Sequence, residues 1–330
     1  MGVTIVIPNY NGINFLKDCL ESLLRQTYRD YEIIIVDNAS TDGSVEWVRE
    51  NYPAVHIIRL SENKGFSAAV NIGIKASDKE FVALVNSDTI AEEDWLFNLV
   101  DMIQGSEDIF SCSSKMLKMS NSQLIDDAGD GYTIFGWAFQ IGNGLSEVRY
   151  NTSRSLVSSC AGAAIYRRKL FSKVGFFDEA YFAYLEDVDI GIRATLLGLK
   201  NVYASKARIL HYGSASTGGG FSEFKVRLSA RNNIWLFKKN FNVFLKIINS
   251  FTFALGWLVM LNVMRKKGFL KSYLSGTFEG LRTHNNVRRE AKYSFFQSLI
   301  FQFKLIVNTF VFFSQKVKKM NSRNFQRVDI

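Results

Sequence analysis

The chain has 330 residues, of which 47% are hydrophobic and only two are proline, with a formal net charge of +9. This composition excludes a disordered, fibrous or Pro-rich linker protein and predicts a sizeable buried core. The three cysteines are widely spaced and form no C-x-x-C pair, so neither a disulfide framework nor a thiolate metal site is expected. A reducing compartment fits best, and the short apolar run at the N-terminus indicates a first strand rather than a secretory signal.

The excess positive charge belongs to the C-terminal part of the chain. Residues 1–240 contain 25 Lys and Arg against 28 Asp and Glu, whereas residues 241–330 contain 15 against 3, giving net charges of −3 and +12. The C-terminal part also holds two strongly apolar stretches, Ile247–Met264 and Tyr293–Phe313, with basic residues at their borders. Such stretches favour an anionic membrane surface. We therefore predict one domain of residues 1–240 and a basic, aromatic, helical membrane-associating region of residues 241–330.

Two spanning helices in this region would place their connecting segment, residues 265–292, on the far side of the bilayer. That segment carries eight Lys and Arg against two Glu, contrary to the positive-inside tendency. Helices lying in the cytoplasmic interface are therefore preferred, with a re-entrant hairpin, a single span, or a helical subdomain with its own core as alternatives. A nucleic-acid partner is not expected, because the aromatic residues occur in apolar blocks rather than singly between basic residues.

The first 110 residues alternate short β-rich runs with segments of helical periodicity. The expected strands and helices follow one another as Val3–Ile7, Asn14–Gln26, Glu32–Val36, Ser44–Asn51, Val55–Leu60, Ser67–Ala76, Phe81–Val85 and Glu92–Gln104. This βαβα pattern predicts a parallel sheet with helices on both faces. Ligands bind beyond the carboxyl ends of the strands in such sheets, so the polar residues after each run are candidate site residues.

From about residue 111 the pattern is less regular. The expected elements are a strand at Ala161–Tyr166, a helix at Glu186–Leu197, two strands at Lys200–Ala204 and Ala207–Leu210, and a helix over residues 223–240. The first turn of the helix at Glu186 is acidic, which suits the helix dipole.

Six motifs in one order resemble those of the family 2 glycosyltransferases over about residues 3–240. They are Val3–Asn11, Ile34–Ser44, Asn63–Phe66 with Asn71, Asn86–Asp88, Tyr184–Asp189 and His211. The resemblance implies a glycosyltransferase A-type α/β fold with a mixed central sheet and inversion at the anomeric carbon. Its nucleotide-sugar half would comprise residues 1–110 and its acceptor half residues 111–240, followed by the C-terminal helical membrane-associated tail.

The resemblance assigns donor binding to residues beyond the first strands. Asp37 would accept the ring N–H of a pyrimidine, although an aspartate here could instead open an Asx-turn. Uracil and thymine present the same edge to this carboxylate, so it does not separate UDP-sugars from dTDP-sugars. Gly65 would let the backbone approach a diphosphate. The other residues expected to bind the nucleotide are Pro8, Tyr10, Asn63, Asn71 and Asn86.

The segment Asn86-Ser87-Asp88 occupies the position of the family's D-x-D motif, which implies that Asp88 binds a divalent cation, Mn²⁺ or Mg²⁺. His211 would be a second metal ligand. Asn86 departs from the motif and removes one negative charge, but an N-x-D version resembles the branch that includes bacterial rhamnosyltransferases of surface polysaccharides. A turn at the end of a strand and a structural histidine are the alternatives.

The acidic cluster implies the general base. By resemblance, Asp187 takes the proton of the acceptor hydroxyl and Glu186 shapes the acceptor side. Small residues at Cys160 and Gly162 would let the acceptor approach the donor, with core packing as the alternative. Asp189 and Arg193 are four residues apart and are expected to form a pair on the helix surface.

The resemblance leads to one expected function. The protein would transfer a sugar, L-rhamnose from dTDP-rhamnose by preference, to a polyprenyl-linked saccharide in bacterial O-antigen or other surface polysaccharide synthesis. It would act at the cytoplasmic face of the plasma membrane, as a peripheral or monotopic protein. The alternatives are a UDP-hexose transferase of the same family and a catalytically silent scaffold. A nicotinamide-dependent oxidoreductase is excluded because no G-x-G-x-x-G follows the first strand.

Overall fold

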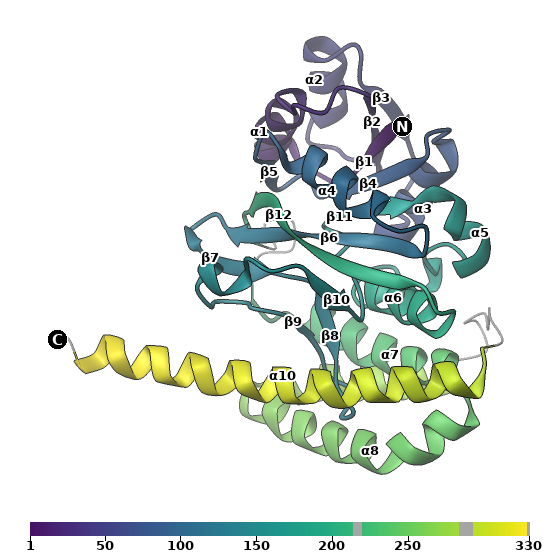
Figure 1. Ribbon diagram of the computed structural model, residues 1–330, viewed down its shortest axis with the longest axis vertical. Coiled ribbons are helices and arrows are strands. Elements are labelled where there is room, and N and C mark those ends of the chain that lie inside the picture. Colours follow the sequence, from purple (N-terminus) through teal and green to yellow (C-terminus); the bar gives the residue numbers. More distant parts are fainter. Residues whose placement is uncertain (214–219, 284–292, 329–330) are drawn as a thin grey trace.

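A mixed ten-stranded sheet forms the centre of the molecule. The structure, a computed structural model, describes residues 1–213, 220–283 and 293–328, with side chains as far as Asn321. Residues 284–292 of the connecting segment lie outside the described residues. The N-terminal half lies at one end of the sheet and the C-terminal helices at the other (Figure 1).

The N-terminal half has the alternation that the sequence predicts. Its strands are parallel, in the order β4-β1-β2-β3. The elements are β1 (Val3–Asn9), α1 (Ile13–Leu24), β2 (Tyr31–Asp37), α2 (Ser44–Asn51), β3 (His56–Arg59), α3 (Gly65–Ala76), β4 (Phe81–Val85) and α4 (Trp95–Gln104). Apolar side chains of α1 and α4 cover one face of the sheet and those of α3 cover the other. The parallel register brings the polar strand ends to one edge.

The second half makes the sheet mixed and differs from the prediction in two strands. Strand β11 (Ala163–Arg167) runs antiparallel to both β4 and β6 (Ile109–Lys118). The sequence gives little sign of β6, because several of its buried residues are polar, among them Ser111, Ser113, Ser114 and Lys115. Strand β12 (Lys200–His211) is one strand rather than two, because a register shift between Ala204 and Arg208 absorbs the interruption.

Short elements complete this half around the sheet. They are β5 (Thr89–Ala91), β7 (Asn121–Asp127), β8 (Asp130–Tyr132), β9 (Ala138–Gln140), β10 (Arg154–Leu156), α5 (Phe171–Val174), α6 (Glu186–Leu196) and the 3-10 turns Glu147–Tyr150, Arg168–Leu170 and Glu179–Tyr181. Strands β8 and β9 form a separate two-stranded ribbon, in which Asp130 lies opposite Gln140. Strand β5 pairs with the end of β12, so His211 lies opposite Thr89.

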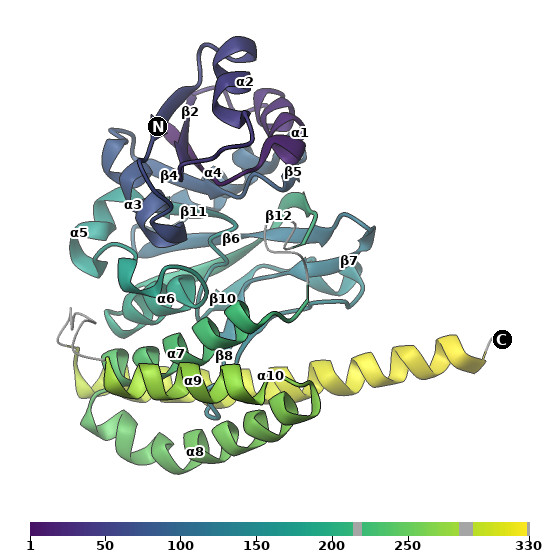
Figure 2. The same cartoon turned by 180° about the vertical axis from the view of Figure 1, so that it is seen from behind.

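Four helices follow: α7 (Glu223–Asn240), α8 (Val243–Lys266), α9 (Leu270–Arg282) and α10 (Phe295–Val328). Figures 1 and 2 show α8, α9 and α10 gathered below α6 and α7, with α10 projecting beyond the body. Helix α9 packs closely against α7, and Gly276 and Gly280 permit this approach. A side chain at either position would collide with the backbone of Arg227 or Arg231.

The C-terminal helices share a core with the second half of the sheet domain. The apolar face of α6 is covered by side chains of α7, α8 and α10, and the cluster comprises Tyr132, Val157, Val188, Ile192, Leu196, Leu236, Phe241, Leu245, Phe301 and Leu305. The C-terminal helices also form a core of their own, with Val226, Ala230, Met264 and Tyr273, so they pack both against α6 and against one another.

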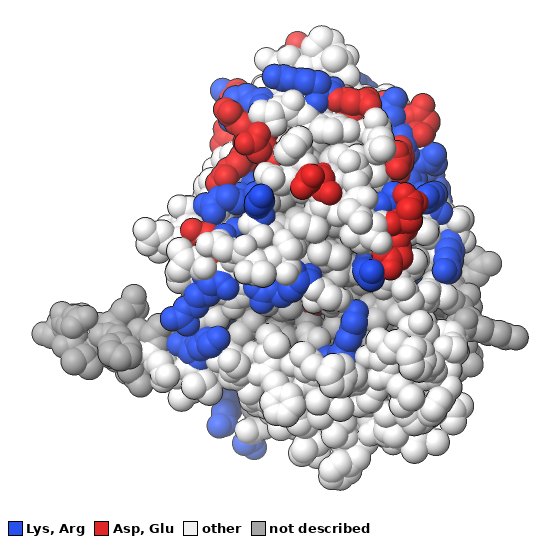
Figure 3. All heavy atoms as spheres, viewed as in Figure 1, with Lys and Arg blue, Asp and Glu red and all other residues white. Residues whose placement is uncertain are grey.

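The outward faces of α8 and α10 are apolar and open to solvent. Both helices contain a stretch long and apolar enough to cross a membrane, Val243–Lys266 and Phe295–Asn321, and only 22% of the most apolar window of each is buried. Phe251 on α8 and Phe303 and Phe310 on α10 are 79%, 67% and 72% exposed. Figure 3 shows a largely uncharged lower surface, whereas the acidic residues visible in this view lie on the upper part.

Candidate active site

The first group of predicted residues lies where β1 and β2 end. Asn9 and Asp37 are partners in register, and Asn9 Nδ2 donates a hydrogen bond to Asp37 Oδ1 at 2.9 Å. The backbone N–H of Ser40, three residues further along the chain, donates to Asp37 Oδ2 at 3.0 Å. Asp37 is fully buried, and these hydrogen bonds hold its carboxylate at the edge of the sheet where the parallel strands end. Pro8 belongs to β1, and Tyr10 follows it with an exposed ring.

The predicted residues around α3 interact with the protein itself. Asn63 Oδ1 accepts from the Gly65 N–H at 2.9 Å, where α3 begins. Gly65 has φ +85°, and a Cβ atom there would lie 2.5 Å from Phe182 O, so the glycine permits contact with the loop before α6. Asn71 is buried and exchanges two hydrogen bonds with the backbone of Phe177, at 2.8 and 3.0 Å. Asn71 thus fixes a loop, and its amide is engaged within the protein.

Asp88 and His211 meet where β4, β5 and β12 converge. His211 Nε2 lies 3.4 Å from Asp88 Oδ1, and His211 Nδ1 lies 2.7 Å from Asp126 Oδ2. Lys118 Nζ is 3.7 Å from the other oxygen of Asp126. A histidine that binds a metal usually has its other ring nitrogen bonded to a carboxylate, which fixes the orientation of the ring. Asp126 occupies this position, and Asp88 faces the nitrogen that would bind the metal. The structure therefore brings the two predicted metal ligands together.

The predicted base lies at the start of α6. Asp187 Oδ1 accepts from the Val188 N–H at 2.7 Å, and Oδ2 accepts from the Ala161 N–H at 3.4 Å. Glu186 is buried, and its Oε2 atom has no hydrogen-bond partner among the described residues. An unpaired buried carboxylate oxygen is costly, so a binding partner for Glu186 is expected in the functional complex.

The turn at Cys160–Gly162 joins these two groups of residues. The backbone N–H of Asn86 donates to Gly162 O at 2.8 Å, while Ala161 in the same turn donates to Asp187. A Cβ atom at Gly162 would lie 3.0 Å from Asn86 Nδ2, so the small residue allows the N-x-D segment to approach the turn. Cys160 and Gly162 thus lie between the predicted metal-binding motif and the predicted base.

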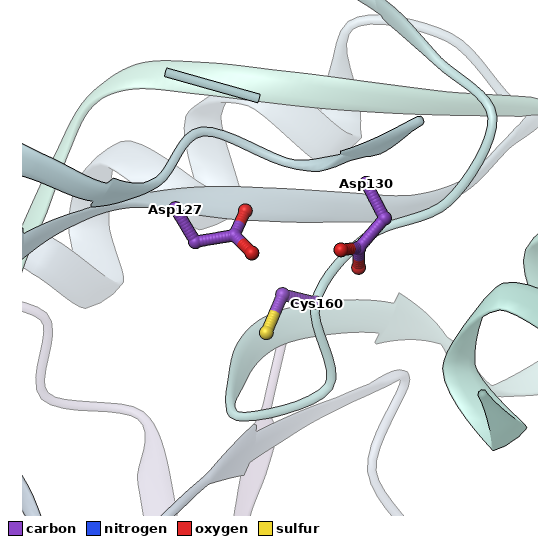
Figure 4. Close-up of side chains that lie close together, drawn as sticks. All are labelled: Asp127, Asp130 and Cys160. Atoms are coloured by element: carbon purple, nitrogen blue, oxygen red, sulfur yellow. The ribbon is translucent and has the colours of Figure 1, made fainter. Parts of the chain in front are cut away.

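Two further carboxylates in this region escaped the sequence analysis. Asp127 and Asp130 lie with Cys160 in one cluster, with one potential ligand atom from each residue within 4.8 Å of the others (Figure 4). Each aspartate has one buried oxygen without a hydrogen-bond partner among the described residues. The run Asp126-Asp127-Ala128-Gly129-Asp130 was the available signal, since three acids in five residues are unusual in a strand ending.

Comparisons with known proteins identify the family of the chain. Residues 4–175 match the sequence model of Glycosyl transferase family 2. The chain belongs to glycosyltransferase family 2. Among its relatives, an N-acetylglucosaminyl-diphospho-decaprenol L-rhamnosyltransferase of Mycobacterium tuberculosis is 28% identical over 242 residues, covering 65% of this chain and 77% of the relative.

Other curated relatives are longer than this chain. Glycosyltransferase GlyA of Streptococcus pneumoniae is 30% identical over 217 residues, which cover 62% of this chain and 30% of the relative. The O-antigen biosynthesis protein RfbC of Myxococcus xanthus is 27% identical over 225 residues, covering 65% of this chain and 17% of RfbC. The chain therefore spans less than a third of the length of these two relatives.

Solved structures share the fold at low sequence identity. GalNAc-T7 with UDP, GalNAc and Mn²⁺ superposes with a TM-score of 0.60 at 17% identity, covering 72% of this chain and 48% of that one. Staphylococcus aureus TarS in complex with UDP-GlcNAc gives 0.57 at 18% identity, covering 87% and 82%. The predicted glycosyltransferase A-type fold, with two apolar C-terminal helices, is confirmed.

The predicted metal-binding position, Asp88 with His211, suits a hard divalent cation. Burial alone would lower the pKa of His211, but its hydrogen bonds to Asp126 and Asp88 and their charges raise it to about 9. A cation would replace that proton between the same two side chains. The cluster of Asp127, Asp130 and Cys160 suits Mg²⁺ or Mn²⁺ less well, because burial raises the pKa of the thiol, and a protonated sulfur is a poor ligand for them.

Four buried acidic groups at and around the predicted base have raised pKa values. Burial raises the pKa of Asp127, Asp130, Glu186 and Asp187, and mutual repulsion raises the pKa of the first three further. Hydrogen bonds from Val188 and Ala161 partly offset this effect at Asp187. A carboxylate with a raised pKa holds a proton more strongly, which a general base requires.

A strained loop carries the predicted base of this family 2 site. Phe182, Tyr184 and Leu185 have φ angles of 64°, 69° and 67°, values that non-glycine residues adopt at a cost. Asn232 on α7 compensates for this cost, because its Nδ2 group donates to the carbonyl oxygens of Tyr181, Ala183 and Tyr184 at 3.1, 2.8 and 2.7 Å. The helix after the sheet therefore positions the loop before Glu186.

Proposed function

We propose that the protein is an inverting, cation-dependent glycosyltransferase that moves one sugar from a nucleoside diphosphate to a lipid-linked saccharide. One observation carries the proposal. The Cys160–Gly162 turn binds the backbone of Asn86 on one side and the carboxylate of Asp187 on the other, so the N-x-D motif and a base share one site.

The residues divide the reaction between them. Asp37 would hold the nucleobase, and Asp88 with His211 would hold a cation that neutralises the diphosphate. Asp187 would take the proton of the acceptor hydroxyl as that oxygen bonds to C1 of the sugar. The C1–O bond to the phosphate breaks on the opposite face, and the nucleoside diphosphate leaves with the electron pair. Atoms and charge balance without a further reactant.

The unpaired carboxylate oxygens lie on the acceptor side of this scheme. Sugar hydroxyls are donors, and Asp127, Asp130 and Glu186 offer buried acceptor atoms without partners among the described residues. Binding of an acceptor saccharide would satisfy these oxygens and would remove part of the cost of burying them. We assign Glu186, Asp127 and Asp130 to the acceptor, together with Cys160 and Gly162.

The donor is assigned from the relatives. The mycobacterial relative is named as an L-rhamnosyltransferase that acts on a diphospho-decaprenol, and RfbC is named for O-antigen biosynthesis. These names support dTDP-L-rhamnose as donor and a polyprenyl-diphosphate saccharide of surface polysaccharide synthesis as acceptor. Mn²⁺ is present in the GalNAc-T7 structure and in a Pyrobaculum calidifontis mannosyltransferase structure, which supports a divalent cation.

The exposed apolar faces of α8 and α10 support work at a membrane. Side chains of α8 and α10 pack in one core with α6, and this core would have to be disrupted if the helices crossed the bilayer. We therefore propose that α8 and α10 lie in the membrane–water interface, with the site above them. We propose the cytoplasmic face of the membrane, because nucleotide sugars are available on that side.

A donor screen tests the function. Purified protein with Mn²⁺ is incubated with dTDP-rhamnose, UDP-glucose, UDP-galactose, UDP-N-acetylglucosamine and GDP-mannose, and mass spectrometry measures donor hydrolysis and transfer. We expect selective use of dTDP-rhamnose, loss of both reactions in Asp88→Ala, and loss of transfer with donor binding retained in Asp187→Asn. Glu50→Gln, an exposed carboxylate on α2, is the control.

The other outcomes separate the alternatives. Use of a UDP-sugar would keep the reaction class and discard rhamnose. If no donor is hydrolysed, transferred or bound, the result would favour a scaffold protein with this fold.

A further inference from the structure

A cavity of about 900 Å³ lies between the β8–β9 ribbon and the helices α7, α8 and α10. This volume is in the range of pockets that enclose whole small ligands, roughly 300–1,000 Å³. Aromatic side chains form much of its wall, including Trp137 and Phe139 of the ribbon, Phe253 and Trp257 of α8, and Phe312 of α10. The cavity is therefore suited to an apolar ligand.

The same cavity is lined by basic residues from three helix regions: Lys225 on α7, Lys267 at the end of α8, and Lys316 and Lys319 on α10. No Asp or Glu is among the described residues that line it. Within the described part of the chain, Lys225, Lys267 and Lys316 form no ion pair. Burial lowers the pKa of Lys225, and Lys267 Nζ lies 3.7 Å from the centre of the Phe221 ring. An anionic group in the cavity would pair with these ammonium groups.

Three residues that line the cavity are neighbours of the acceptor-side carboxylates in the chain or in the ribbon. Tyr184 and Leu185 line it, and the next two residues in the chain are Glu186 and Asp187. Gln140 also lines it and lies opposite Asp130 in the β8–β9 ribbon. A ligand in the cavity thus lies near the loop before α6 and near the β8–β9 ribbon, the elements that carry or adjoin these carboxylates.

We propose that this cavity binds the isoprenoid diphosphate of the lipid-linked acceptor. The aromatic wall contacts the isoprenoid chain, the lysines pair with the diphosphate, and the saccharide extends towards Asp187. The identity of this ligand rests on the function proposed above. The exposed apolar faces of α8 and α10 place the cavity next to the bilayer that supplies the lipid.

Binding of a short analogue tests the assignment without donor or catalysis. Calorimetry on the full chain in detergent compares farnesyl diphosphate, farnesol and inorganic diphosphate. We expect farnesyl diphosphate to bind at least about tenfold more tightly than either fragment, because it uses both the wall and the lysines. Lys267→Glu and Lys316→Glu should each weaken it about tenfold. Lys318→Glu is the matched control, since Lys318 is exposed on the same turn of α10 and does not line the cavity.

A second variant tests the apolar wall. Val263 on α8 lines the cavity, and Val263→Trp should fill it and abolish binding of farnesyl diphosphate while donor hydrolysis stays within about twofold of the wild type. Circular dichroism and the thermal midpoint confirm that the variants are folded.

Three results would overturn the assignment: equal binding of farnesol and farnesyl diphosphate, lysine variants that bind as the wild type does, or no binding by a protein that hydrolyses donor. The last result leaves the proposed transferase function intact. Conversely, binding of farnesyl diphosphate by a protein that uses no donor would support the cavity assignment and refute the proposed function.

Discussion

Asp127, Asp130 and Glu186 are buried, and each has one oxygen without a hydrogen-bond partner in the described part of the chain, an arrangement that destabilises the folded protein. Burial raises the pKa of Asp130, and the neighbouring charges of Asp127, Asp187 and Glu186 raise it further. An acid with a raised pKa in the folded state costs stability above the pKa of the unfolded chain, about 4 for aspartate. A protein keeps such groups where a ligand needs them.

Removal of one of these carboxylates should therefore stabilise the folded protein and impair sugar transfer. In Asp130→Asn we expect the free energy of unfolding at pH 8 to rise by about 1–2 kcal/mol, a gain that shrinks as the pH falls towards 4. Transfer should fall at least about tenfold while donor hydrolysis is unchanged. Urea titrations at several pH values and a transfer assay measure both, with Asp101→Asn on α4 as control. A less stable variant with normal transfer would show a structural role instead.

Asp189 has the opposite electrostatic character from its neighbours. Burial alone would raise its pKa, but the charges of Lys239 and Arg193 and a hydrogen bond from Asn240 lower it to about 2. Its Oδ2 atom lies 2.9 Å from Arg193 and 3.1 Å from Lys239, and its side chain is fully buried. The expected pair of Asp189 and Arg193 is therefore present, but it is buried rather than on the helix surface, because α7 covers this face of α6.

This carboxylate should set part of the acid stability. Its folded pKa is lower than that of the unfolded chain, so its contribution is complete above pH 4 and is lost as the pH falls from about 4 to about 2. The loss should amount to about 2 kcal/mol. Unfolding in urea between pH 2 and 5 should show this dependence in the wild type and its absence in Asp189→Asn. Lys239→Gln should reduce this pH dependence only partly. If both variants keep the pH dependence of the wild type, Asp189 is not the group responsible.

At the scale of elements, the loop Phe182–Leu185 depends on a residue outside the family's motifs. Asn232 lies on α7, and one side-chain nitrogen holds three carbonyl groups of the loop. Loss of these bonds would let the strained residues relax and would displace the base that follows them.

Asn232→Ala should therefore lower kcat by about 10–100-fold and leave the KM for the donor within about twofold. Steady-state kinetics at a temperature where the variant is folded measure both constants. Arg227→Gln, on the same helix but paired only with Glu279 among the described residues, is the control. A loss of stability with normal kcat would mean that Asn232 serves folding alone.

The sequence predicts the elements where the pattern is local. The N-terminal strands and helices follow from apolar periodicity, and their polar ends give Asp37 and Asp88 directly. Strand β6 was not predicted because it lies between β11 and β12 in the sheet. Its buried residues include serines and Lys115, so it lacks an apolar pattern. Asp127 and Asp130 escape for a related reason, since only the tertiary fold brings a strand end and the β8–β9 ribbon to the turn at Cys160.

For the whole molecule, the exposed apolar side chains of α8 and α10 make one extended surface. Phe251, Phe303 and Phe310 are among its most exposed members. Each phenylalanine moved from water into lipid should contribute about 1 kcal/mol or more.

The combined variant Phe251→Ser, Phe303→Ser, Phe310→Ser should bind anionic phospholipid vesicles about a hundredfold more weakly than the wild type. Cosedimentation with vesicles at low and high salt measures this affinity. Phe97→Ser is the control, because Phe97 is 52% exposed on α4, in the nucleotide half. Equal binding by the wild type and the triple variant would contradict a role of these helices at the membrane.

The core shared by α6 and α10 has a consequence for the synthesis of this protein. Phe301 and Leu305 cover α6, yet they are made more than a hundred residues after Asp187. At about 5–20 residues per second, the ribosome delivers this cover roughly 5–20 seconds after the predicted base. During that interval the nascent chain exposes the part of the apolar face of α6 that α10 covers, and a chaperone would protect it in this period. The site can reach its final form only after nearly the whole chain has emerged.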